Sequence, residues 1–168
     1  WGGPKGRTEI LSFSNAFHGR TYGALSMMDR VRYKAGFEPF LTNCTILPFN
    51  DPAALTSNVG DATLAVFLEF IQGEGGIVPA SAEFVGAIAS LQRRHGFLVV
   101  ADEIQSGIGR TGRPFAFSHY DIAPDIAVVA KPLGGGLPLG AILGSGTVEG
   151  VLDIGQHGTT FGGNPVSC

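Results

Sequence analysis

Short apolar runs rich in β-branched residues recur along this chain, and segments with helical periodicity separate most of them. Runs of roughly four to eight such residues, bounded by Gly, Pro, Asn or Asp, are typical of strands buried in a sheet. Strands that alternate with helices form parallel βαβ units, whose helices cover both faces of the sheet. We therefore expect one α/β domain with a mostly parallel sheet and strands at 9–15, 45–50, 63–70, 97–104, 126–130 and 140–145.

Three segments carry helical signals. The clearest helix is predicted over 81–96, with Ser81 as its N-cap and Gly96 as its stop. A second helix is predicted over 51–60, because the segment opens with an Asp–Pro pair suited to the N-cap and first helical positions. A third is expected over 21–28. These helices supply the layers that a buried parallel sheet requires.

Polar or charged residues end four of the predicted strands, although the strands themselves are apolar. In open α/β sheets, ligands bind in the crevice outside the carboxyl ends of the strands. We therefore expect these strand ends to share one crevice, formed by residues 15–20, 69–74, 102–105 and Lys131.

Asp102 and Lys131 place a carboxylate and an amine at the ends of two apolar strands. They could form a buried ion pair, although such a pair stabilises a fold poorly because desolvation offsets the attraction. A partly buried lysine loses its proton more easily and becomes a nucleophile that can form a Schiff base. A carboxylate on a pyridine nitrogen keeps that nitrogen protonated. The two residues together indicate pyridoxal phosphate as a cofactor, with the ion pair as the alternative.

Three glycines at 134–136 follow Lys131 closely. Glycine lets the backbone pass close to a flat cofactor and its phosphate without a side-chain clash. A nucleotide-phosphate loop would instead place its lysine after the glycines, with Ser or Thr next. Here Lys131 precedes the glycines and Pro132 follows it, so the pattern favours the cofactor interpretation.

The composition is 44% hydrophobic and 15% charged with a net charge of −3, which indicates a globular protein and argues against a nucleic-acid partner. The apolar runs are too short to span a bilayer. Two cysteines, Cys44 and Cys168, fit a reducing compartment better than a disulfide framework. We expect a cytoplasmic location, or the mitochondrial matrix or a plastid in a eukaryote. The four histidines lack the spacing of metal ligands, so no metal site is expected.

Five motifs together resemble the class III, fold-type-I aminotransferases in that family's order: FHGRT (17–21), IQGEGG (71–76), ADEIQSGIGRTG (101–112), AKPLGGGLPLGA (130–141) and HGTTFGGNP (157–165). The resemblance implies a three-layer α/β/α large domain that binds pyridoxal phosphate over residues 1–168. The chain starts without Met and ends just after a glycine-rich stretch. We therefore expect an internal fragment without the family's upstream phosphate loop, N-terminal substrate segment and small C-terminal domain.

The resemblance also assigns cofactor contacts. Lys131 resembles the lysine that bonds to the cofactor, and Asp102 resembles the partner of its ring nitrogen. The other implied contacts are Phe17 and Ile104 on the two ring faces, His18 near the ring edge, Gln105 on the phenolic oxygen and Thr160 on the phosphate. Thr160 would reach the neighbouring subunit, which makes a homodimer part of the active site.

Substrate contacts are implied for three residues. Arg20 resembles the guanidinium that holds a substrate carboxylate, a role that suits its planar fork. Glu74 resembles a switch residue that pairs with an arginine of the C-terminal part. Glu69 is expected to orient the pocket from behind the residues that line it. Phe17 and Arg20 could also be an ordinary core residue and an ordinary surface residue. The family commonly has Pro where Phe70 stands, which leaves the placement of Glu69 open.

Two features of the motif at 101–112 are interpreted as structural. Glu103 directly follows Asp102 and would point to the opposite face of the strand. The GRTG sequence at 109–112 is expected to be a turn that holds the site and not a loop that cradles an anion.

Within the family, the motifs FHGRT, GEGG and GTTFGGNP are most similar to those of acetylornithine aminotransferases. The resemblance implies conversion of N-acetylornithine and 2-oxoglutarate to N-acetylglutamate semialdehyde and glutamate, a step of arginine biosynthesis. Lys131 would act as general base and acid in the proton shift. Ornithine and 4-aminobutyrate remain alternative amino donors. An aminomutase or decarboxylase on the same scaffold, or a catalytically inactive fragment, also remains open.

Overall fold

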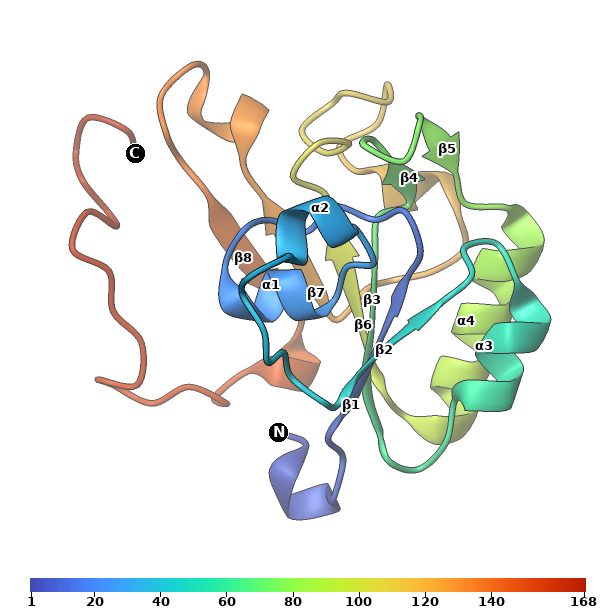
Figure 1. Cartoon of the computed structure of the whole chain (residues 1–168). Helices are drawn as coiled ribbons and strands as arrows, with labels where there is room; N and C mark the ends of the chain where they lie inside the picture. Colours follow the sequence, from blue (N-terminus) through green and yellow to red (C-terminus); the bar gives the residue numbers. More distant parts are fainter.

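The computed structural model describes residues 1–168, which form a six-stranded sheet flanked by helices (Figure 1). Its order is β2-β1-β3-β6-β7-β8, where the strands are β1 (Glu9–Phe13), β2 (Cys44–Leu47), β3 (Thr63–Leu68), β6 (Leu98–Asp102), β7 (Ile126–Val129) and β8 (Ala141–Gly144). The first five run parallel, and β8 is antiparallel to β7. The α/β class and the mostly parallel sheet expected from the sequence are confirmed.

Every expected strand is present, and each ends one to three residues earlier than the apolar pattern predicts. Local turns explain the early ends. Asn15 has a positive φ of 62°, and Lys131 has a φ of 46°, so neither residue can extend a strand. Asp102 ends β6 because its Oδ1 accepts a hydrogen bond from the backbone N–H of Ile104 at 3.1 Å. The polar residues after the strands therefore lie beyond the sheet edge.

Strand β8 departs from the parallel arrangement because its connection is short. Only residues 130–140 join β7 to β8, and they hold a 3-10 turn over Lys131–Gly134 but no α-helix. A parallel crossover takes about a dozen residues or more and usually a helix. A shorter connection returns the chain alongside β7 in the opposite direction.

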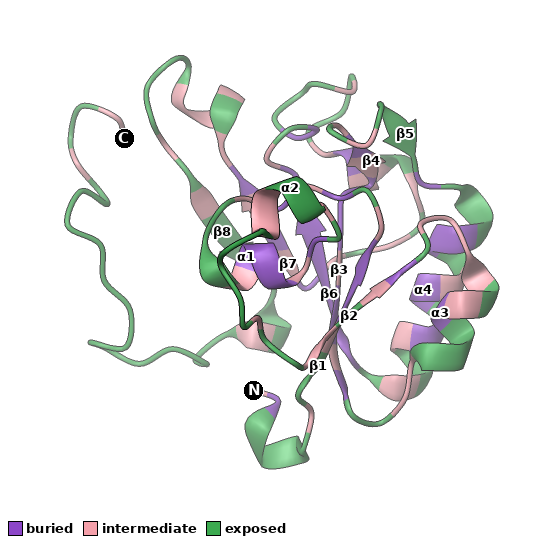
Figure 2. Cartoon of the chain, viewed as in Figure 1, coloured by how far each residue is buried: buried purple, intermediate pink, exposed green.

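One face of the sheet is covered by α3 (Pro52–Asn58) and α4 (Ala82–His95) (Figures 1 and 2). Their termini follow the sequence prediction. Asp51 and Ser81 accept backbone hydrogen bonds as N-caps, and Gly96 ends α4 with a left-handed φ of 68°. Their apolar sides pack on a continuous core that includes Leu11, Phe13, Leu55, Val66, Leu68, Phe84, Ile88 and Val99. The longest helix, α4, has 14 residues, and no helix is long and apolar enough to cross a membrane.

The opposite face carries two shorter helices, α1 (Tyr22–Ser26) and α2 (Val31–Lys34). The hydroxyl of Ser12 on β1 donates to the carbonyl of Met27 at 2.8 Å and ties the end of α1 to this face. The apolar cluster here is small, with only Ala65, Leu98 and Val100 fully buried. The third layer is thus thinner than the first. Helix α2 was not predicted, because its four residues are too few to show a periodic pattern.

A small hairpin, β4 (Ile71–Gln72) with β5 (Val78–Pro79), was also not predicted. It turns through the glycine-rich part of the IQGEGG motif above the end of β3. Phe70, at the position where the family commonly has Pro, is fully buried against the rings of Phe117 and Tyr120. The substitution therefore adds an apolar anchor directly beside the strand end.

Candidate active site

A cavity of about 130 Å³ lies at the carboxyl ends of β1, β3, β6 and β7. Its walls are Phe17, His18, Gly19, Glu69, Glu74, Asp102, Ile104, Gln105 and Lys131. Eight of the ten side chains selected from the sequence thus line one cavity, and Arg20 and Thr160 do not. Parallel strands bring these distant segments together because they all end at the same edge of the sheet.

Asp102 is buried at the floor of this cavity, with 4% of its surface exposed. Its Oδ2 accepts a hydrogen bond from His18 Nδ1 at 2.9 Å. The His18 ring packs edge-on against Phe67, with ring centroids 4.6 Å apart, and its Nε2 is buried without a partner. No lysine or arginine pairs with Asp102, so the ion pair with Lys131 considered above does not form. The carboxylate is therefore oriented but not neutralised by a lysine or arginine.

Lys131 directly follows β7 and begins the 3-10 turn over Lys131–Gly134. Its side chain makes no hydrogen bond or ion pair and is exposed, so the expectation of a partly buried lysine is wrong for this chain. No other segment of residues 1–168 covers the amine. The turn closes through Gly135 and Gly136, which have φ values of 58° and 111° that a side chain would disfavour. The glycines of the motif thus serve the turn that directs the lysine.

Glu69 connects two loops of the site. Its two carboxylate oxygens accept hydrogen bonds from the backbone N–H groups of Phe17 at 2.8 Å and Gly73 at 2.9 Å. Burial raises the pKa of Glu69, and these two hydrogen bonds act in the opposite direction. The residue borders the cavity, but its oxygens are used to fix the backbone around it.

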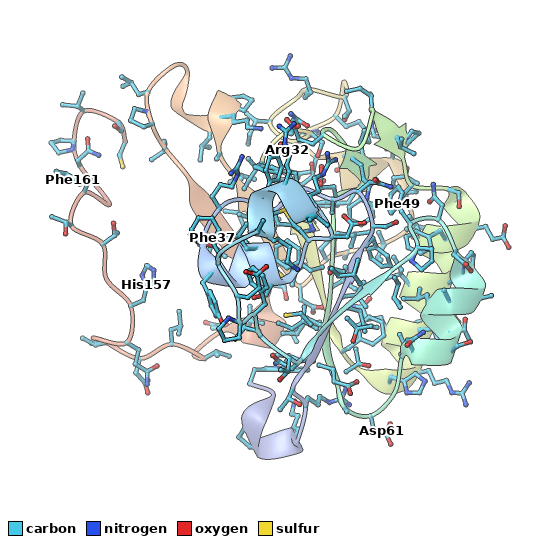
Figure 3. The ribbon with its side chains drawn as sticks, in the orientation of Figure 1. Arg32, Phe37, Phe49, Asp61, His157 and Phe161 are labelled. Atoms are coloured by element: carbon cyan, nitrogen blue, oxygen red, sulfur yellow. The ribbon has the colours of Figure 1, made fainter.

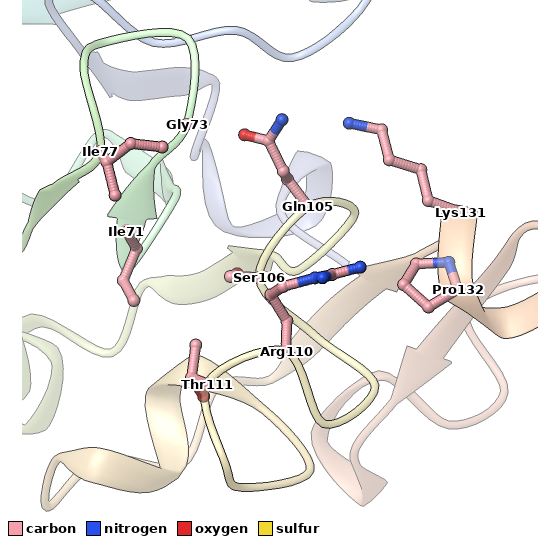
Figure 4. A pocket seen from close by; sticks show the side chains of 9 residues that line it. All are labelled: Ile71, Gly73, Ile77, Gln105, Ser106, Arg110, Thr111, Lys131 and Pro132. Atoms are coloured by element: carbon pink, nitrogen blue, oxygen red, sulfur yellow. The ribbon is translucent and has the colours of Figure 1, made fainter.

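Gln105 occupies a place that only a glycine at position 73 leaves open. A Cβ atom on Gly73 would lie 1.1 Å from Oε1 of Gln105. The Gln105 side chain therefore requires a glycine at position 73. It projects between Gly73 and Lys131 (Figure 4).

Arg20 lies outside the cavity. Its guanidinium carbon is 3.9 Å from the centroid of the Tyr33 ring and 5.9 Å from that of Phe17. Such cation–π contacts hold the side chain against the aromatic rings. The sequence offered no signal for Tyr33, because it belongs to the unpredicted helix α2.

A larger cavity of about 670 Å³ shares Gln105 and Lys131 with the first one (Figure 4). Its other walls are Ile71, Gly73, Ile77, Ser106, Arg110, Thr111 and Pro132. Arg110 belongs to the GRTG sequence, which forms a turn with left-handed glycines at 109 and 112, as predicted. The turn presents the Arg110 side chain to this cavity.

Glu103 has the structural role expected for it. The residue is fully buried, and its carboxylate accepts from the hydroxyl of Ser106 at 2.7 Å and from the N–H groups of Ala116 and Phe117, both at 3.0 Å. It thereby fastens both ends of the loop that carries Gln105 and Arg110.

The side chains of the smaller cavity fit pyridoxal phosphate. They provide an amine for its aldehyde, a buried carboxylate for its ring nitrogen, an amide for its phenolic oxygen and apolar groups for its ring faces. No group of three or more His, Cys, Asp or Glu side chains is arranged to hold a metal ion.

The fold and this set of side chains define an α/β enzyme scaffold with its reactive groups at the strand ends. The sequence profile of the family described as Aminotransferase class-III matches residues 2–168, so the chain belongs to the class-III aminotransferases, a family that uses pyridoxal phosphate.

Individual relatives agree with this family. The chain is 45% identical to an acetylornithine aminotransferase of Archaeoglobus fulgidus, over 97% of this chain and 44% of the relative. It is 46% identical to an acetylornithine/succinyldiaminopimelate aminotransferase of Yersinia pestis, over 96% of this chain and 40% of the relative. An ornithine aminotransferase structure from Toxoplasma gondii superposes with a TM-score of 0.90 at 35% identity, over 96% of this chain and 38% of that one. The chain thus spans about two fifths of the length of these relatives.

Proposed function

We propose that residues 1–168 belong to the cofactor-binding large domain of an enzyme that moves the terminal amino group of N-acetylornithine to 2-oxoglutarate. The products are N-acetylglutamate semialdehyde and glutamate, and the reaction belongs to arginine biosynthesis. The observation that carries the proposal is that Asp102 and Gln105, at and just after the end of β6, border one cavity with Lys131, which follows β7. The names of the relatives from Archaeoglobus fulgidus and Yersinia pestis support N-acetylornithine as the donor.

Five side chains hold the cofactor in this proposal. Asp102 keeps a proton on the ring nitrogen, and its hydrogen bond from His18 keeps the carboxylate in position. Gln105 donates to the phenolic oxygen. Phe17 and Ile104, which both line the cavity, would contact the two faces of the ring and exclude water from it. When bound, pyridoxal phosphate supplies an aldehyde that takes up amino groups and a ring that accepts the electron pair of the neighbouring carbon.

Lys131 moves the proton. Its Nζ would hold the cofactor through its aldehyde, and the same amine would take a proton from the amino-bearing carbon of the substrate as a general base and return it as an acid. The exposed position of Lys131 beside both cavities supports this role, because the amine is accessible to a substrate.

The active protein in this proposal is a homodimer. Residues 149–168 contain no helix or strand, and their apolar side chains are exposed, with Phe161 at 81% (Figure 3). Thr160 lies in this segment and borders neither cavity near Lys131. A role on the phosphate of the neighbouring subunit's cofactor explains why it does not fold against its own site.

An amino-donor screen on the complete natural polypeptide tests the function. The cofactor-loaded protein is given 2-oxoglutarate with N-acetylornithine, ornithine or 4-aminobutyrate, and glutamate formation is measured. N-acetylornithine is expected to give the largest kcat/KM, and Lys131→Ala is expected to abolish turnover. A larger kcat/KM with another donor would reject N-acetylornithine, and absence of glutamate with all three would reject transamination of these donors.

A further inference from the structure

Phe70 lies between β3 and the hairpin of β4 and β5, and its ring makes contacts outside both cavities. The side chain is fully buried. Its ring centroid lies 5.5 Å from that of Tyr120 and 6.2 Å from that of Phe117. Both partners belong to the segment at 115–120, so the ring joins two parts of the chain that are distant in sequence.

Hydrogen bonds close the base of the hairpin at the same place. The N–H of Ala80, which follows β5, donates to the carbonyl of Phe70 at 2.9 Å. The carbonyl of Ala80 accepts a hydrogen bond from the Tyr120 hydroxyl at 2.7 Å. Phe70, Ala80 and Tyr120 therefore form a closed set of contacts, which holds both ends of the hairpin against the segment at 115–120.

The segment at 115–120 is in turn fixed to the end of β6. The carboxylate of Glu103 accepts from the N–H groups of Ala116 and Phe117, both at 3.0 Å. Glu103 directly follows Asp102, the last residue of β6. The Phe70 ring thus connects the hairpin with this strand end through Phe117 and Glu103, neither of which lines a cavity beside Lys131.

The separation of the hairpin from the end of β6 determines the space that is left for Gln105. Gly73 in the hairpin lies so close that a Cβ on it would fall 1.1 Å from Oε1 of Gln105 (Figure 4). Gln105 itself belongs to the loop that Glu103 fastens at Ser106. A shift of the hairpin relative to β6 would therefore change the place of the amide. Closely packed aromatic rings resist such a shift, because few other arrangements fill the same buried volume.

We propose that Phe70 is a positioning residue, which holds Gly73 against Gln105 and so keeps the Gln105 amide in the smaller cavity. This role rests on the proposed function, because it takes the amide as the donor to the cofactor's phenolic oxygen. Asp102 is held by hydrogen bonds that do not involve the hairpin. The ring therefore acts on the amide and not on the carboxylate of the site.

The pH dependence of the absorbance of the bound cofactor, measured on the complete cofactor-loaded polypeptide, tests this role. A donor on the phenolic oxygen stabilises its negative charge, so loss of the donor is expected to raise the pH at which the bound chromophore loses its proton. Gln105→Ala removes the donor and gives the reference shift, about 0.5 to 1 pH unit upward. Phe70→Leu keeps the core apolar without the flat ring and is expected to shift the midpoint upward by a smaller amount.

Phe84→Leu is the matched control, because Phe84 is a fully buried ring of the same core and lines neither cavity. Urea denaturation is expected to show a comparable loss of stability in both leucine variants, whereas only Phe84→Leu keeps the natural midpoint. Hydrogen exchange of the cofactor-free polypeptide gives a second readout, in which residues 71–79 are expected to exchange faster in Phe70→Leu than in Phe84→Leu. Tyr120→Phe is a milder variant that removes only the hydroxyl bound to Ala80, and a small upward shift is expected.

An unchanged midpoint in Phe70→Leu would overturn the proposal, and if that variant does not fold, an unchanged midpoint in Tyr120→Phe would do so. An equal shift in Phe84→Leu, or a shift in Phe70→Leu with none in Gln105→Ala, would also overturn it. Failure of the proposed function looks different, because the natural polypeptide then forms no glutamate while the midpoint still depends on Phe70. If glutamate forms and the midpoint ignores Phe70, the function stands and the positioning role does not.

Discussion

Nδ1 of His18 lies 2.9 Å from Oδ2 of Asp102, and both side chains are buried. As a carboxylate, Asp102 accepts this hydrogen bond, so Nδ1 carries the proton. The contact joins the loop after β1 to the end of β6, which are 84 positions apart in the sequence. The histidine of the FHGRT motif thus orients the aspartate of the candidate site.

Replacing His18 by alanine is expected to destabilise the protein by about 2 kcal/mol, because a buried carboxylate loses its hydrogen-bond partner. Urea denaturation of the cofactor-free protein measures the loss. His18→Asn keeps a donor near the position of Nδ1 and is expected to lose less. Equal losses in the two variants would show that packing against Phe67, and not the hydrogen bond, is what His18 contributes.

Gly73→Ala is expected to displace Gln105 from the site, because the new Cβ would overlap its Oε1. The expected result is weaker cofactor binding and a shifted absorbance spectrum of the bound cofactor, since in the proposed site the phenolic oxygen loses the amide donor. Gly86→Ala is the matched control. A Cβ on Gly86 meets nothing within 4 Å on the exposed side of α4, so this variant is expected to gain about 0.5–1 kcal/mol of stability with an unchanged spectrum. An unchanged spectrum in Gly73→Ala would contradict the packing argument.

Local signals account for the parts of the fold that the sequence predicted. The caps at Asp51 and Ser81 and the stop at Gly96 act through neighbouring atoms, so they can be identified without tertiary contacts. The grouping of strand ends into one crevice followed from the parallel sheet alone. These two kinds of signal explain why most of the selected side chains border the same cavity.

The remaining features depend on contacts that a sequence pattern does not carry. The exposure of Lys131 reflects the absence of any covering segment within residues 1–168, and the stacking of Arg20 on Tyr33 depends on the position of a four-residue helix. The cavity around Arg110 is formed by three separate loops, so no single motif encodes it. The direction of β8 was set by connection length, which the strand pattern does not show.

Glu103→Ala is expected to cost about 3 kcal/mol or more, because two buried donors and one partly buried donor lose their acceptor at once. The loop between Gly107 and Arg113 should then become the first site of limited proteolysis, since its two ends are no longer fastened. Glu149→Ala, which removes an exposed carboxylate, serves as the control and is expected to leave the digestion pattern unchanged. Proteolysis that starts elsewhere in Glu103→Ala would show that other contacts hold this loop.

The pKa of Glu69 leads to a stability difference that depends on pH. Burial raises the pKa of this carboxyl in the folded state, so the folded protein binds the proton more tightly than the unfolded chain does. The contribution of Glu69 to the free energy of unfolding is therefore fully present below the pKa of the unfolded chain. It is lost as the pH rises through the pKa of the folded protein. Glu69→Gln removes the titration and keeps one oxygen for the N–H groups of Phe17 and Gly73.

The stability of the natural protein relative to Glu69→Gln is therefore expected to increase as the pH is lowered from neutral toward mildly acidic values. Urea denaturation of both proteins at a series of pH values measures this difference, and Glu83→Gln, at an exposed position of α4, controls for the change in net charge. A difference that shrinks on acidification would mean that the two backbone hydrogen bonds outweigh desolvation. In that case Glu69 would hold the Phe17 and Gly73 loops as a stable anion, and its contribution to the site would be lost in acid.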